Sequence, residues 1–209
     1  HIVSASLRKR GDMMTEQKTQ LIRSYVARRL GWLQTQAEHP QKAILANLRR
    51  GVGHAPGDLP ELWGALLQDF PLELESQDGI PTRAEWATYL ALTCYALHQQ
   101  GHGLPKDNMH QKDARFGQAV RKLVKPKEQP DDASVLRRFN ALATASTMPE
   151  CAHHLRGIIQ LLRAGGIPLD YVQLAEDLYW LQNPVTAQRV RLRWGQDYYY
   201  APKTEGTNQ

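Results

Sequence analysis

The chain has 209 residues, of which 42% are hydrophobic, and its formal net charge at pH 7 is +5. That length suits one or two domains with a proper core, and two cysteines without a Cys-x-x-Cys motif exclude a disulfide framework and fit a reducing cytoplasm. No apolar run approaches the roughly 20 residues of a membrane span, and the small positive excess means that nucleic-acid binding would depend on where the bases lie.

The two ends of the chain differ from the part between them. Residues 1–12 are interpreted as an expression leader, because they lack the apolar segment of a signal peptide and precede Met13-Met14. Residues 202–209 are polar and are expected to be a mobile tail. We expect residues 13–201 to form a single all-helical domain, with 13–110 and 111–201 as possible halves.

The first half of the chain contains four segments with the apolar spacing of amphipathic helices. They cover residues 15–36, 40–50, 58–70 and 82–100. In the first segment, Arg29 and two other arginines lie off the apolar face. The fourth begins with a Thr-x-x-Glu capping box and is the most apolar of all, so we expect it at the centre of the core.

The second half contains four further helical segments and one ambiguous segment. The helices are expected at residues 112–124, at 133–143 with Asp131 or Asp132 as the cap, at 147–165 and at 170–182. In 185–200, arginines alternate with apolar residues, which suits a strand. Nothing else in the chain offers a strand partner, so we expect a helix. We expect an all-α bundle of seven to eight helices, fewer than the segments because the shortest need not form helices of their own, with little or no sheet.

The helix expected at 147–165 has two clearly separated faces. Its apolar face contains Ala152, Leu155, Ile158, Ile159 and Leu162. Its polar face contains His153, Arg156, Gln160 and Arg163, and no carboxylate. Solvated helix faces usually mix charges, because pairs of opposite sign four residues apart stabilise them. A face of guanidinium groups suits a polyanion, although an ordinary solvated face explains this pattern equally well.

Basic residues also occur in groups near the ends of other helices. These groups are Arg49-Arg50, Arg121-Lys122, Arg137-Arg138 and the segment 189–193. For Arg49-Arg50 the helix macrodipole is an alternative explanation, because it favours cations at a C-terminus. We take as candidate nucleic-acid-binding residues Arg49, Arg50, Arg121, Lys122, Arg137, Arg138, Arg156 and Arg163.

Motifs for catalysis or metal binding are weak in this sequence. His98 and His102 have the spacing of a zincin helix, but the glutamate of that motif is missing and Gly101 ends the helix. Neither a phosphate-binding P-loop nor a G-x-S-x-G elbow is present. We therefore expect no catalytic residue, no metal and no cofactor.

Several stretches together resemble a known family. They are ANLRRGVGHAPGDLPELW, the helix ending ALHQQG, RFGQAVRKL, LRRFNALATAS, HLRGIIQLLRAGGIPLDYVQLAEDLYW and VRLRWGQDYYY, which together span about residues 45–199. Their order and spacing are similar to those of the CasB family, the small subunit of the type I-E CRISPR surveillance complex called Cascade. The resemblance implies an all-helical, non-catalytic protein, two copies of which associate as a dimer within the complex.

The resemblance also implies partners and contact residues. The implied partners are the guide RNA, the target and non-target DNA strands, and the large and backbone subunits of Cascade. By position, the family's basic stretches match Arg49, Arg50, Arg137, Arg138 and Arg156, whereas Gln196 stands where the family more often has a base. The implied function is to hold phosphates without reading sequence and to stabilise the R-loop and its displaced strand. The alternative is a helical scaffold whose basic faces bind acidic proteins.

Overall fold

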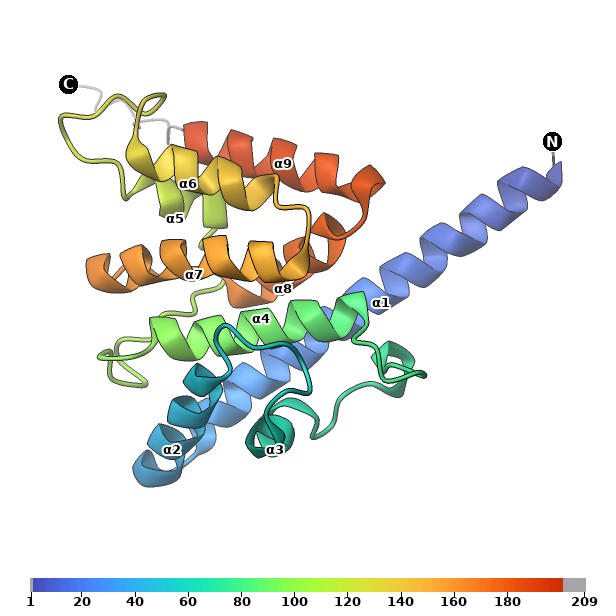
Figure 1. The fold of residues 1–209 in the computed structure, drawn as a ribbon, viewed down its shortest axis with the longest axis horizontal. Coiled ribbons are helices and arrows are strands. Elements are labelled where there is room, and N and C mark those ends of the chain that lie inside the picture. The colour runs from blue at the N-terminus through green and yellow to red at the C-terminus, as the bar shows by residue number, and fades with distance from the viewer. Residues whose placement is uncertain (1, 201–209) are drawn as a thin grey trace, which may run out of the picture.

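Nine α-helices form the part of the chain that the structure describes (Figure 1). The structure is a computed structural model that describes the backbone of residues 2–200 and the side chains of residues 5–200. The helices are α1 (Ile2–Thr35), α2 (Glu38–Arg50), α3 (Trp63–Leu66), α4 (Arg83–His98), α5 (Phe116–Arg121), α6 (Ser134–Ala143), α7 (Met148–Gly165), α8 (Tyr171–Leu181) and α9 (Pro184–Tyr199). Within 2–200 there is no strand, only an isolated bridge between His110 and Leu169. The predicted all-α fold is confirmed, and the expected tail at 202–209 lies outside the described residues.

Helix α4 runs through the centre of the core, as its composition predicts. Every side chain from Ala87 to His98 is buried, because α1, α2, α7 and α8 pack around this helix (Figure 1). Its start is fixed by the predicted capping box, in which Thr82 Oγ1 accepts from the Glu85 amide at 3.0 Å and Glu85 Oε1 accepts from the Thr82 amide at 2.9 Å. A helix with no exposed face is stabilised chiefly by packing.

The ambiguous C-terminal segment is a helix. Asn183 caps α9 through its side chain, and the helix buries Trp194 and Tyr198 against α5. The two helices approach so closely at Gly117 that a Cβ there would lie 2.4 Å from the Trp194 carbonyl oxygen. The alternating arginines are therefore a consequence of helical packing and do not mark a strand.

The prediction of a continuous helix at residues 58–70 is wrong. The chain forms a 3-10 turn at Pro60–Leu62 and the four-residue helix α3. The carbonyls that a longer helix would use accept side chains of α1 instead: Arg29 Nε donates to the Ala65 oxygen at 3.0 Å, and Tyr25 Oη donates to the Leu66 oxygen. These long-range bonds replace the helical ladder.

The same contacts show that the prediction for Arg29, which was expected to lie off the apolar face of α1, is wrong. Its side chain is only 4% exposed and its guanidinium lies 3.9 Å from the centroid of the Trp32 ring. Burial lowers the pKa of Arg29, but a guanidinium stays charged at neutral pH. The hydrogen bonds to backbone carbonyls and the stacked ring compensate this buried charge.

Some predicted helix boundaries also differ from the structure. Helix α1 begins at Ile2 and not at residue 15. The helix expected at 112–124 is limited to α5, because Asp113 has a left-handed backbone (φ 64°) and its amide donates to Asp170 Oδ2 at 2.9 Å. Helix α6 starts after Ala133, so neither of the two predicted aspartates caps it.

Candidate nucleic-acid interface

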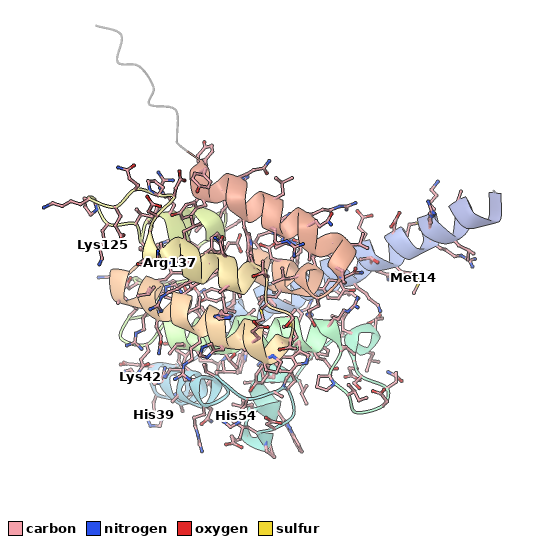
Figure 2. The ribbon with its side chains drawn as sticks, turned by 45° about the horizontal axis from the view of Figure 1, so that its top comes forward. Met14, His39, Lys42, His54, Lys125 and Arg137 are labelled. Carbon is pink, nitrogen blue, oxygen red and sulfur yellow. The ribbon has the colours of Figure 1, made fainter. Side chains whose placement is uncertain are left out.

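Helix α7 carries the basic face that the sequence predicts, and local signals fix both of its ends. Thr147 Oγ1 accepts from the Glu150 amide at 3.3 Å, although the Glu150 carboxylate bonds Ser146 and not Thr147, so only half of a Thr-x-x-Glu capping box forms. Gly166 ends the helix with φ +60°, which glycine adopts without strain. Figure 2 shows α7 between α6, which carries Arg137, and the part of the molecule that carries His54.

Arg49 at the end of α2 lies close to Arg163 near the end of α7. Burial lowers the pKa of the half-buried Arg49, and the nearby positive charge of Arg163 lowers it further. Arg163 donates to the amide oxygen of Gln100 at 2.8 Å, a neutral partner. Two like charges thus sit together, and no described carboxylate forms an ion pair with either of them, which favours an anion between or above them.

Arg156 and Arg138 extend this positive surface along α7. A terminal nitrogen of Arg156 lies 4.0 Å from the position that a Cβ at Gly53 would take, so Arg156 reaches over the loop that follows α2. A terminal nitrogen of Arg138 lies 3.6 Å from the corresponding position at Gly157. Arg138 of α6 therefore lies over α7, and the arginines of three helices share one exposed surface. We call the surface formed by Arg49, Arg138, Arg156 and Arg163 the basic surface.

The predicted site residues have few intramolecular counter-charges. Among the eight of them, only Arg50 forms an ion pair with another described residue, at 3.5 Å from Glu61. Arg137 and Lys122 are exposed. An arginine without a carboxylate partner keeps its positive charge, and the donors that it does not use within the protein, for an external oxyanion.

Other basic residues predicted from the sequence are bound within the protein. Arg121 donates to the Tyr198 carbonyl at 3.1 Å and its guanidinium lies 5.4 Å from the Tyr198 ring centroid. In the C-terminal segment, Arg193 pairs with the buried Asp177. Asp177 also accepts from Trp194 Nε1 at 2.8 Å. These two arginines stabilise the packing of α9, and the structure does not bring them to the basic surface.

The two histidines with zincin spacing have separate roles. His98 is fully buried, with Nδ1 2.8 Å from Tyr171 Oη. His102 donates from Nε2 to the Arg163 carbonyl at 3.0 Å, while its Nδ1 lies 2.6 Å from Asp107 Oδ2. Burial lowers the pKa of His102, but the bonds to Asp107 and to the Arg163 carbonyl raise it overall. No group of His, Cys, Asp or Glu within the described residues could hold a metal ion.

His102 lies beside Arg163, a contact that the sequence did not reveal. Considered there only as a possible metal ligand, it bonds the Arg163 carbonyl and forms an ion pair with Asp107 when protonated. The signal that could have found it is Asp107 five residues later, but the loop that brings them together is not apparent from sequence.

Within residues 2–200, no helix combines the length and apolar character that a membrane crossing requires.

A family model described as CRISPR-associated protein Cse2 matches residues 44–199, about three quarters of the chain. This chain belongs to the Cse2 family. The match begins and ends almost where the predicted resemblance does, so the family prediction is confirmed, and the Cse2 match includes every residue of the basic surface.

Two solved structures are similar to this Cse2-family protein. The first is CasB from Thermobifida fusca, with 36% sequence identity and a TM-score of 0.70, over 86% of this chain and 98% of that one. The second is a CRISPR-associated protein of the Cse2 family from Thermus thermophilus, with 26% identity and a TM-score of 0.60, over 83% of this chain and 97% of that one. A search of curated proteins finds no match.

Proposed function

We propose that this Cse2-family protein is the non-catalytic small subunit of a type I-E Cascade complex, and that its basic surface holds nucleic-acid backbone without sequence specificity. Two copies would lie beside the guide RNA and the DNA target and contact the large and backbone subunits. In that position, phosphate contacts stabilise the R-loop and the displaced strand in antiviral defence. Base pairing with the guide supplies the sequence specificity, as in other RNA-guided effectors.

The observation that carries this proposal is the cluster of arginines from α2, α6 and α7 that form no ion pair with a carboxylate of residues 5–200. Like charges held together on a folded surface disfavour one another unless an anion is bound. Phosphate groups suit guanidinium geometry, and each contact releases counterions from the nucleic acid. None of these contacts requires a base edge, which supports binding that is independent of sequence.

The test is fluorescence anisotropy with labelled random-sequence single-stranded DNA, duplex DNA and RNA of equal length, each titrated at several salt concentrations. We expect sequence-independent binding that weakens steeply as salt rises. Arg156→Ala and Arg138→Ala should each reduce the slope of log affinity against log salt by about 0.7 on single strands and about 0.9 on duplex DNA. Thermal stability should change little, because exposed charges rarely contribute more than about 1 kcal/mol.

The matched control is Arg83→Ala. Arg83 is an exposed base at the start of α4, outside the basic surface, so its removal should leave the salt slope unchanged. If Arg83→Ala lowered the salt slope as much as the other two variants, their effect would come from the lower net charge of the protein and not from contacts at the basic surface. Binding that does not grow with DNA length would instead favour the scaffold alternative, in which the basic faces bind acidic proteins.

A further inference from the structure

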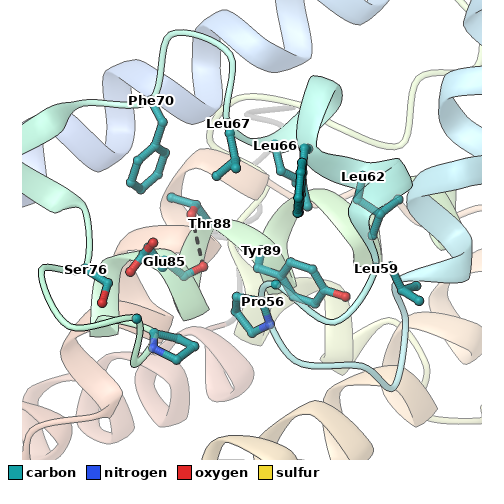
Figure 3. Close-up of a pocket in the computed structure, with 14 residues that line it drawn as sticks. Pro56, Leu59, Leu62, Leu66, Leu67, Phe70, Ser76, Glu85, Thr88 and Tyr89 are labelled. Carbon is teal, nitrogen blue, oxygen red and sulfur yellow. Dashed lines mark hydrogen bonds between the residues drawn. The ribbon is translucent and has the colours of Figure 1, made fainter.

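A pocket with an apolar lining lies between α4 and the chain segment that was expected to be a helix. Figure 3 shows Leu66, Leu67 and Phe70 on one side and Thr88 and Tyr89 of α4 on the other. The pocket has a volume of about 180 Å³. An apolar protein cavity of roughly 150 Å³ can hold a benzene molecule, so this pocket has room for one large apolar side chain.

The polar groups in the pocket are already hydrogen-bonded. Glu85 Oε1 accepts from the Thr82 amide at 2.9 Å, Thr88 Oγ1 donates to the Ala84 carbonyl at 2.9 Å, and Tyr89 Oη donates to the Gly51 carbonyl at 2.7 Å. An uncharged polar ligand would therefore be desolvated with few groups free to bond it, and the second carboxylate oxygen of Glu85 could accept only from a donor. The lining favours an apolar guest.

The mouth of the pocket exposes large apolar side chains. Trp63 is 54% exposed and Leu67 is 51% exposed. Ile80, between the lining residues Gly79 and Pro81, is 69% exposed. An apolar patch that surrounds an apolar pocket is typical of interaction sites, and Trp is the residue most often found at their centres.

The chain segment that forms one wall of the pocket is acidic. Residues 58–78 contain no Lys or Arg and six exposed acids, which are Asp58, Glu61, Asp69, Glu73, Glu75 and Asp78. Of these, only Glu61 and Asp58 lie within ion-pair distance of a described base. Six negative charges repel nucleic acid, so a phosphate backbone does not suit this surface. They attract a cationic partner.

We propose that this pocket docks a segment of a partner protein that presents one large apolar or aromatic side chain flanked by lysines or arginines. The apolar side chain enters the pocket beside Trp63, and the flanking cations meet the acids of residues 58–78. The proposal is independent of nucleic-acid binding, because the pocket contains none of the residues of the basic surface.

The test uses three labelled peptides of equal length and the full chain. The first has a central phenylalanine between lysines, the second has alanine in its place, and the third has phenylalanine between glutamates. We expect the first to bind, the second to bind about tenfold or more weakly because one buried aromatic side chain is lost, and the third not to bind.

Variants of the protein separate the apolar and the ionic contributions. Trp63→Ala should weaken the lysine–phenylalanine peptide about tenfold and leave the lysine–alanine peptide unchanged. Asp69→Lys, at an exposed acid next to the lining residue Phe70, should weaken both lysine peptides. The matched controls are Leu192→Ala, at an exposed apolar residue of α9, and Asp132→Lys, at an exposed acid outside residues 58–78. Both controls should bind like the unaltered protein.

Three outcomes would overturn the proposal. One is equal affinity for the phenylalanine and alanine peptides, and another is no binding up to about 1 mM peptide. The third is self-association of the full chain in sedimentation velocity that Trp63→Ala removes. Leu7 and the adjacent bases of α1 are exposed and have the chemistry of the expected guest, so this result would assign the pocket to a second copy. DNA binding by Trp63→Ala should be unchanged. A failure of the pocket proposal can therefore be distinguished from a failure of the proposed nucleic-acid binding.

Discussion

The buried histidine His98 makes a quantitative prediction about stability and pH. Its ring is fully buried, its Nδ1 is bonded to Tyr171 and its Nε2 has no hydrogen-bond partner among the described residues. Burial lowers the pKa of His98 to about 4, and the positive charges of His102 and Arg163 contribute to the same shift. In the unfolded chain a histidine titrates near 6.5. Between these two values the unfolded state binds more protons than the folded state.

The sign and the size of the effect follow from linkage. Because the unfolded state binds the extra proton, the free energy of unfolding falls as pH drops from about 6.5 towards 4. At pH 5, the pH is about 1.5 units below the pKa of the histidine in the unfolded chain, so that histidine is protonated. The histidine in the folded protein is still mostly neutral at this pH. At about 1.4 kcal/mol per unit, the loss is about 2 kcal/mol at pH 5 and about 3 kcal/mol below pH 4.

The assay is urea denaturation at pH 7.5 and pH 5, followed by circular dichroism, for the unaltered chain and for His98→Gln. Other groups also titrate between these pH values, so the informative quantity is the difference between the two proteins. The pH-dependent loss should be smaller by about 2 kcal/mol in His98→Gln. His39→Gln, at an exposed histidine of α2, is the control and should follow the unaltered chain. The same pH dependence in His98→Gln and in the unaltered chain would refute the reasoning.

Other predictions concern packing and the thiols. Gly117→Ala would place a Cβ against the Trp194 carbonyl and should lower the free energy of unfolding by about 1–3 kcal/mol, whereas Gly195→Ala, with no atom in the way, should be neutral or slightly stabilising; a urea titration compares them. Asp177→Ala leaves the buried Trp194 Nε1 without its acceptor and should cost about 1–3 kcal/mol in the same titration, and no cost would mean that water replaces the carboxylate. Both cysteines are buried, and burial raises the pKa of each thiol to about 12, so a thiol reagent should react only after unfolding. Rapid reaction of the native protein would contradict their burial.

The fold was predictable wherever local signals decide it. The capping box at Thr82 and the left-handed glycine at 166 act within one turn of the chain, so the limits of α4 and α7 follow closely from sequence. The helix expected at 58–70 failed because its outcome depends on Tyr25 and Arg29, some 35 to 40 residues earlier. Sequence periodicity contains no information about such a partner.

The candidate site was also predictable only where local sequence decides the outcome. The exposure of Arg156 follows from its position opposite the apolar stripe of α7, and the structure agrees. Whether an arginine is free depends on acceptors that are distant in sequence. Arg121 bonds the Tyr198 carbonyl and Arg193 bonds Asp177, and their local sequences do not differ from those of the arginines that remain unpaired.

The bonds from α1 to the short helix α3 also have a consequence for local unfolding. Residues 60–70 form few backbone bonds of their own, and so short a segment is unstable by itself. Because Tyr25 and Arg29 bond its carbonyls, the segment cannot open fully unless α1 releases it. We therefore expect the Leu67 amide, which donates to the Trp63 carbonyl at 2.8 Å, to exchange its hydrogen with solvent as slowly as the amides in the middle of α1. In hydrogen-exchange experiments the pocket wall and the first helix should behave as one cooperative unit.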